Sequence, residues 1–231
     1  MPFFYYDATY VLVLIGMLLS LAASAKVKST YARYAREKSL SGMTGEEAAR
    51  KILSTAGIYD VRVQHVAGNL TDHYDPRNKT LNLSDSVYGN ASVAAVGVAA
   101  HECGHAIQHD RGYAPLKIRS SIAPVASFGA NISWPLILLG LFLGGNEFLI
   151  QGGIILFSLA VLFQLVTLPV EFNASDRAVK LLSETGILYA DELRKTRKVL
   201  SAAALTYVAA AASSILQLLR LVLLFGNRRR D

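Results

Sequence analysis

The chain has 231 residues, of which 52% are hydrophobic and only 17% are charged. Soluble domains carry about 25% charged residues, so the composition argues against a wholly soluble protein and favours membrane-spanning segments. The net charge of +6 comes without a stacking-aromatic, zinc-knuckle or basic-helix pattern, so we expect a lipid bilayer and no nucleic acid as partner. The single cysteine excludes an internal disulfide.

The first predicted element is an uncharged stretch over residues 8–25. It approaches the length of about 20 apolar residues that crosses a bilayer. A cleaved signal peptide would need a basic start, whereas residues 1–7 contain no Lys or Arg and the basic residues begin at Lys26. We therefore predict an uncleaved anchor, after which the chain enters the cytoplasm.

A short helix and a small sheet follow the anchor. Thr44 and Glu47 have the spacing of a capping box, which predicts that a helix starts there. Residues 61–66 and 80–84 alternate as strands do, and residues 75–79 between them are typical of a turn. The pattern predicts a small antiparallel sheet with 80–84 as its edge, to which an extended peptide substrate would add as a strand.

The sequence H-E-x-x-H then occurs at His101, Glu102 and His105, within a helical run over 92–108. Residues four apart share a helix face, so both imidazoles point at one metal ion and Glu102 lies beside the water that the metal would acidify. The alternative is two solvated histidines beside a surface glutamate. Small apolar residues over 93–100 predict a buried helix instead, whose polar groups need partners. The pattern therefore predicts a zinc hydrolase.

A catalytic zinc site needs three protein ligands and a water. The metzincin pattern is excluded, because Gln108 and Arg111 stand where its glycine and third histidine would be. His109 lies on the same helix face, but about 12 Å along the axis from His101. We expect His109 at the surface or in a supporting position.

The candidate third ligand is Glu171. Apolar stretches over 122–145 and 148–170 precede it, and each is long enough to span a bilayer. This hairpin would leave the domain and return Glu171 to the side of the membrane that holds the histidines. Ser175 or Asp176 would then orient a ligand imidazole. The alternative is an interfacial charge at Glu171.

The last apolar stretch, residues 200–219 with a continuation over 221–226, is rich in alanine and only mildly apolar. It is either a buried helix of the catalytic domain or a further span. A fourth crossing would place the arginines of the basic tail outside, against the positive-inside tendency.

The fold class we expect is mainly α and integral to the membrane, with about four transmembrane helices and an α+β catalytic domain. The expected parts are an N-terminal anchor (1–25), a first catalytic part with the sheet and motif helix (26–120), a transmembrane hairpin (121–170), a second catalytic part with the glutamate helix (171–199) and a C-terminal apolar helix with a basic tail (200–231).

Three segments, taken together, resemble the YugP-type neutral zinc metallopeptidases of bacterial membranes, and the resemblance runs through nearly the whole chain. The segments are Thr71-Asp72-His73-Tyr74-Asp75-Pro76, Ala99 to Gln108 and Pro169 to Ser175. The chain is more distantly similar to the HtpX-type membrane proteases. This resemblance implies a zincin-like domain with a gluzincin-like site, in which the zinc ligands are His101, His105 and Glu171 and the general base is Glu102. The distant family has E-x-x-x-D after its ligand, whereas here Ser175 holds that position and Asp176 comes one residue later.

The function we expect is a membrane-embedded zinc metalloendopeptidase with its active site at the cytoplasmic face of the cell membrane. Its substrates would be polypeptides, membrane proteins among them. His73 and Tyr74 are candidate donors to the tetrahedral oxyanion, or they shape a loop. The alternative function is a catalytically silent zinc-binding scaffold or chaperone. A transporter would carry charges inside its spans, and the long apolar stretches lack them except at Arg220. The oligomeric state stays open.

Overall fold

The computed structural model describes residues 7–226, so the basic tail predicted at 227–231 lies outside the described residues. The chain divides into two compact units. One, here called the apolar unit, consists of the described parts of Met1–Ser24, Ile118–Leu168 and Thr206–Asp231. The other, here called the motif unit, consists of Ala25–Lys117 and Pro169–Leu205.

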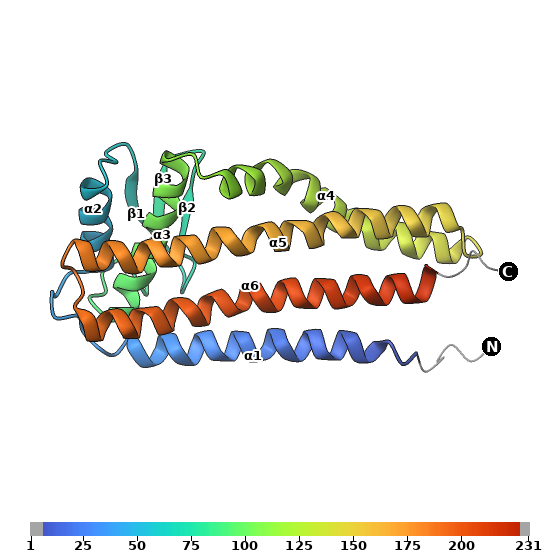
Figure 1. The fold of residues 1–231 in the computed structure, drawn as a ribbon, viewed down its shortest axis with the longest axis horizontal. Coiled ribbons are helices and arrows are strands. Elements are labelled where there is room, and N and C mark those ends of the chain that lie inside the picture. Colours follow the sequence, from blue (N-terminus) through green and yellow to red (C-terminus); the bar gives the residue numbers. More distant parts are fainter. Residues whose placement is uncertain (1–6, 227–231) are drawn as a thin grey trace. The chain divides into compact units, whose positions relative to one another are not determined.

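Helices predominate along the described chain (Figure 1). Its elements are α1 (Tyr10–Tyr34), α2 (Gly45–Thr55), β1 (Arg62–Val66), β2 (His73–Asp75), β3 (Thr80–Ser84), α3 (Val93–Asp110), α4 (Ala114–Phe142), α5 (Glu147–Glu184) and α6 (Ala190–Phe225). Four of the helices, α1, α4, α5 and α6, are long and apolar enough to cross a membrane. The alanine-rich stretch at 200–219 is thus part of one long helix, α6, which passes the same length and hydropathy criteria as the other three.

The three strands form one small sheet in the motif unit, in the order β1–β3–β2. β1 pairs with β3 in parallel, whereas β2 pairs with β3 antiparallel and places His73 opposite Asn82. The prediction of a purely antiparallel sheet with residues 80–84 at its edge is therefore wrong. The chain changes direction between β1 and β2 and again between β2 and β3, so β3 runs parallel to β1. It lies between its two neighbours, and all five of its residues are buried.

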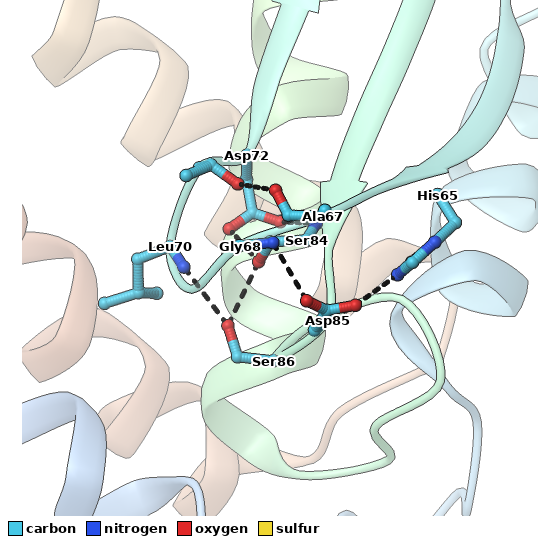
Figure 2. Close-up of polar contacts among 9 residues, drawn as sticks. His65, Ala67, Gly68, Leu70, Asp72, Ser84, Asp85 and Ser86 are labelled. Carbon is cyan, nitrogen blue, oxygen red and sulfur yellow. Dashed lines mark hydrogen bonds and ion pairs between the residues drawn. The ribbon is translucent and has the colours of Figure 1, made fainter.

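The loop between β1 and β2 is fixed to the end of β3 (Figure 2). The Asp72 carboxylate accepts hydrogen bonds from the backbone N–H and the hydroxyl of Ser84, at 2.7 and 2.9 Å. Asp85 accepts a third from the Gly68 N–H at 2.9 Å, and its other oxygen contacts the His65 ring. Burial raises the pKa of Asp72 above its usual value, although the Ser84 hydrogen bonds act in the opposite direction. These contacts place β2 beside β3.

Two local predictions are confirmed. The turn after β2 occupies residues 76–79, and the Asp75 carboxylate accepts a hydrogen bond from the Arg77 N–H at 2.9 Å. This turn joins β2 to β3, because β2 comes between the two predicted strands in the sequence. The helix α2 begins with the predicted capping box, in which Thr44 accepts from the Glu47 N–H and the Glu47 carboxylate accepts from the Thr44 N–H.

The core of the motif unit lies where α2 and the sheet pack against α3. α3 begins after Ser92, whose hydroxyl accepts a hydrogen bond from the Ala95 N–H. Its small residues allow close packing: a Cβ built on Gly97 would lie 2.7 Å from Cγ2 of Thr196 on α6. Cys103 is fully buried, and its thiol contacts the Ala49 carbonyl at 3.6 Å.

The apolar unit is also closely packed. A Cβ built on Gly129 of α4 would lie 2.8 Å from the backbone oxygen of Leu156 on α5. Arg220, the one charge among the long apolar stretches, is paired. Its guanidinium contacts the Asp7 carboxylate at 3.2 Å and lies 4.2 Å from the centre of the Tyr10 ring. A transporter would carry charges inside its spans, and Arg220 is the one such charge in the long apolar stretches. Its contacts with Asp7 and Tyr10 give it a structural role.

The packing of α3 against α6 gives a prediction about stability. The Thr196 hydroxyl is buried and has no hydrogen-bond partner among the described residues. Thr196→Val keeps the shape of the side chain and removes the unsatisfied hydroxyl, so it should stabilise the protein by about 1 kcal/mol. Thermal unfolding of the detergent-solubilised protein, followed by circular dichroism, should show a melting temperature higher by roughly 2–4 °C.

The matched control is Thr185→Val, directly after the end of α5, because the Thr185 hydroxyl donates to the Leu181 carbonyl at 2.7 Å. That variant should gain no stability. An equal gain in both variants would show that the missing partner at Thr196 has no energetic effect.

Candidate metal centre

The two motif histidines lie one turn apart on α3. Their ring centres are 4.8 Å apart and their planes meet at 86°. The helix around them is mostly buried, and each histidine side chain keeps only 12–13% of its surface exposed. Glu102, between them in sequence, is 8% exposed. The two rings are therefore mostly buried and lie side by side on one face of α3.

Glu171, on α5, faces both rings. Its Oε2 atom lies 3.3 Å from Nε2 of His101 and 3.5 Å from Nε2 of His105, and its side chain is 3% exposed. The three ligand atoms all fall within 4.8 Å of one another. Ligands on a tetrahedral zinc with bonds of 2.0–2.1 Å are about 3.3–3.4 Å apart. The carboxylate oxygen therefore stands at the distances from the two nitrogens that one shared zinc ion would require.

This approach of α5 to α3 depends on Gly104. A Cβ built on Gly104 would lie 2.6 Å from the backbone oxygen of Ala174 and 3.1 Å from its Cα. The two helices thus touch backbone to backbone beside the histidines. Since Glu171 precedes Ala174 by three residues and Ser175 follows it directly, the contact brings both side chains to the ligand group.

The far side of each imidazole is held by a neighbour. Nδ1 of His101 lies 3.2 Å from the Ser175 hydroxyl, and Nδ1 of His105 lies 3.0 Å from Oε1 of Gln108. Such contacts fix ring orientation and increase ligand basicity in metal sites. Of the two positions predicted to orient a ligand, the structure brings Ser175 to a histidine, whereas Asp176 is exposed.

Gln108 also fixes which nitrogen of His105 carries the proton. Its amide nitrogen donates to the Val170 carbonyl at 2.8 Å and to Oδ1 of Asn173 at 3.0 Å. Its oxygen must therefore face His105, so Nδ1 donates and the Nε2 of the neutral ring presents a lone pair to the Glu171 carboxylate. Two electron-rich atoms that face each other repel unless a proton or a metal ion lies between them. This donor set fits a divalent metal.

The electrostatics of His105 agree with this arrangement. Burial of the ring acts to lower the pKa of His105, but the nearby carboxylates of Glu171 and Glu102 and the bond to Gln108 outweigh it. The net result is a raised pKa. The centre thus favours positive charge despite its burial.

Gln108 is the residue of this centre that the sequence analysis did not assign. It is fully buried and stands three residues after His105, on the same helix face. Arg177 extends the chain of contacts, because its Nε donates to Oδ1 of Asn173 at 2.7 Å. An amide one turn after the second histidine was the available signal.

The predicted oxyanion donors lie on β2 and point in opposite directions. The His73 ring contacts the Thr71 carbonyl at 2.9 Å and the Asn82 amide at 3.0 Å. The Tyr74 hydroxyl instead reaches α3 and lies 2.9 Å from Nδ1 of His109. Burial, followed by the charges of nearby aspartates, raises the pKa of Tyr74 to about 12, so its phenol is a neutral hydrogen-bond donor. The structure brings Tyr74 to the motif helix, and it gives His73 partners on the sheet.

The chain matches known proteins along nearly its whole length. Residues 9–226 match the family described as "Putative neutral zinc metallopeptidase". The chain is 50% identical, over 220 residues, to a protein of Bacillus subtilis (strain 168) named "Putative membrane protease YugP". The alignment covers 95% of this chain and 97% of that protein. No solved structure gives a significant match.

Fold, site and match together define a membrane protein of the zinc metallopeptidase class, with four helices suited to crossing a bilayer. The chain belongs to the neutral zinc metallopeptidase family that these matches identify, as the resemblance in its three sequence segments indicated.

The contacts of Gln108 predict a loss of metal affinity. Gln108→Ala removes the acceptor that holds His105 and the donor that ties α3 to α5. Zinc affinity, measured by competition with a chromophoric chelator, should fall by about 10–100-fold.

Gln64→Ala is the control, because the Gln64 amide donates to Asn82 on the sheet at 2.6 Å and lies outside the ligand group. Its zinc affinity should match that of the unchanged protein. Unaltered affinity in Gln108→Ala would show that the buried amide does not support the metal centre.

Proposed function

We propose that this protein is a membrane-embedded zinc metalloendopeptidase, with zinc held by His101, His105 and Glu171. One observation carries the proposal: a single carboxylate oxygen faces both Nε2 atoms at 3.3 and 3.5 Å while both Nδ1 atoms are held from behind. When bound, zinc lowers the pKa of a water molecule to about 7 and polarises a carbonyl group. The catalytic part would combine residues 26–120 and 171–199.

Glu102 supplies the general base in this proposal. It accepts a proton from the attacking water and passes it to the amine that leaves when the peptide bond breaks. Its position next to His101 on a buried helix turn supports this role. Tyr74 is the better of the two oxyanion candidates, because its protonated phenol lies against α3 whereas His73 is held on the sheet.

A substrate polypeptide would bind as an additional strand on β2. With β3 in the centre of the sheet, β1 and β2 are its two edges, and β2 is the edge that carries Tyr74 to the motif helix. An unpaired edge strand offers backbone donors and acceptors to an extended peptide, which makes recognition tolerant of sequence. This supports polypeptides as the substrate class, membrane proteins among them.

The second candidate is a catalytically silent scaffold or chaperone with a structural zinc. Structural zinc sites are closed by four protein ligands, whereas catalytic sites have three and an open position. Across residues 7–226, the ligand group contains His101, His105 and Glu171. Three ligands favour catalysis.

Two variants separate these functions. Glu102→Gln should keep zinc and lose hydrolysis of an unfolded reporter protein by a factor of about 10²–10⁴, because only the base is removed. Glu171→Ala should lose both zinc and activity. Zinc content by elemental analysis and peptide release are measured on the same samples.

Glu184→Gln, an exposed position at the end of α5 that contacts Lys180, is the control and should retain both properties. A Glu102→Gln protein that still cleaves the reporter would refute the proposed base. Zinc binding without cleavage in the unchanged protein would favour the scaffold.

We also propose that the protein lies in the cell membrane with its catalytic part in the cytoplasm, because the basic residues follow the first apolar stretch. In intact spheroplasts, a membrane-impermeant maleimide should label the variant Glu147→Cys, whose new cysteine begins α5 after the α4–α5 turn. It should label Tyr59→Cys, at a residue 82% exposed in the motif unit, only after lysis.

The unchanged protein is the blank, because burial raises the pKa of its single thiol, Cys103, and keeps it unreactive. Labelling of Tyr59→Cys in intact spheroplasts would place the catalytic part on the opposite side of the membrane.

A further inference from the structure

A cavity lies in the motif unit, and none of the candidate metal ligands lines it. Its volume is about 850 Å³, and it lies between the end of α1 and the beginning of α6. Five of its lining residues are cations: Lys26 and Arg33 from α1, and Arg194, Arg197 and Lys198 from α6. The lining contains no carboxylate.

The cations are arranged in two facing stripes. On α1 the lining positions are 26, 29, 30, 33 and 34, and on α6 they are 194, 197, 198, 201, 202 and 205. Spacings of three and four residues keep each set on one helix face. The positive charges of two helices therefore point into one space, where they repel one another unless an anion lies between them.

The nearest carboxylates are already engaged. Asp191 pairs with Arg194 and Lys195, and Glu37 pairs with Lys195 at 2.7 Å. Glu37 and Asp191 line a neighbouring pocket of about 270 Å³, which Arg33, Arg194 and Lys198 also line. No carboxylate pairs with Lys26, Arg33, Arg197 or Lys198 anywhere in residues 7–226. The cavity thus carries a surplus of positive charge that the described protein does not neutralise.

The rest of the lining is apolar or weakly polar. It includes Tyr34, Ala202 and Leu205. In sequence, the cations on α1 directly follow the apolar stretch 8–25, and those on α6 directly precede the alanine-rich stretch. Both helices therefore change from charged to apolar at the cavity, at the position where a lipid changes from headgroup to acyl chain.

We propose that this cavity binds one anionic phospholipid, with its phosphate headgroup among the cations and an acyl chain along Ala202 and Leu205. Charge complementarity selects an anion, and the apolar portion of the lining selects an amphiphile over a free phosphate. Basic pockets beside membrane helices bind such headgroups. The site is separate from the metal ligands, so it does not depend on the proposed peptidase function.

The test compares lipid binding by the purified full-length protein in an uncharged detergent, measured by native mass spectrometry. Phosphatidylglycerol and phosphatidylcholine with identical acyl chains are the two probes. The unchanged protein should retain one phosphatidylglycerol with an affinity about tenfold higher than for phosphatidylcholine. Arg33→Gln/Arg197→Gln should lose about tenfold in affinity for phosphatidylglycerol, because two of the facing cations are removed.

The control is Lys28→Gln/Arg36→Gln, which removes two exposed charges, one on α1 and one just after its end, that do not line the cavity. Its affinity should stay within about twofold of the unchanged protein. If circular dichroism shows that the first variant is unfolded, Lys26→Gln/Lys198→Gln replaces it with the same expectation.

Three results would overturn the proposal. Equal losses in the cavity and control variants would indicate diffuse attraction to any charged surface. Equal binding of the two lipids would show that the headgroup is not recognised. Full displacement of phosphatidylglycerol by millimolar inorganic phosphate would show a small-anion site that does not require a lipid.

Discussion

The contact between Gly104 and Ala174 determines how the candidate metal centre is built. A side chain at position 104 would meet the backbone of α5 at 2.6 Å, so only glycine lets the two helices approach this closely. Because Glu171 and Ser175 lie within one helix turn of Ala174, the contact sets how closely both side chains approach the histidines. The motif histidines and their carboxylate partner thus owe their spacing to a residue that carries no functional group.

Around this contact the buried polar side chains form hydrogen bonds with one another. Gln108 donates to α5 and accepts from His105, which uses both ends of one amide inside a buried helix. Such a group is costly without its partners and rigid with them. The centre is therefore held in shape from the outside, and each imidazole turns its Nε2 atom toward Glu171.

Much of this could be predicted from the sequence, for identifiable reasons. The two histidines and Glu102 lie within one helical turn, where periodicity alone fixes their geometry. Glu171 followed from the need for a third ligand and from its position directly after an apolar stretch. β2 was missed because three residues are too few to show alternation, and without it the sheet was given the wrong direction and edge. Gln108 was missed because its spacing from His105 shows only a shared helix face, whereas its role depends on carbonyl and amide groups of a helix 62 and 65 residues away.

The hairpin between the two halves of the centre has a consequence for biosynthesis. Glu171 is made 70 residues after His101, and α4 and most of the apolar part of α5 lie between them. A ribosome therefore incorporates both motif histidines well before it translates Glu171. A chain that stalls, or whose hairpin fails to insert, holds two of the three side chains. Hydrolytic ability, on the function proposed for this protein, would arise only at a late step of its own assembly.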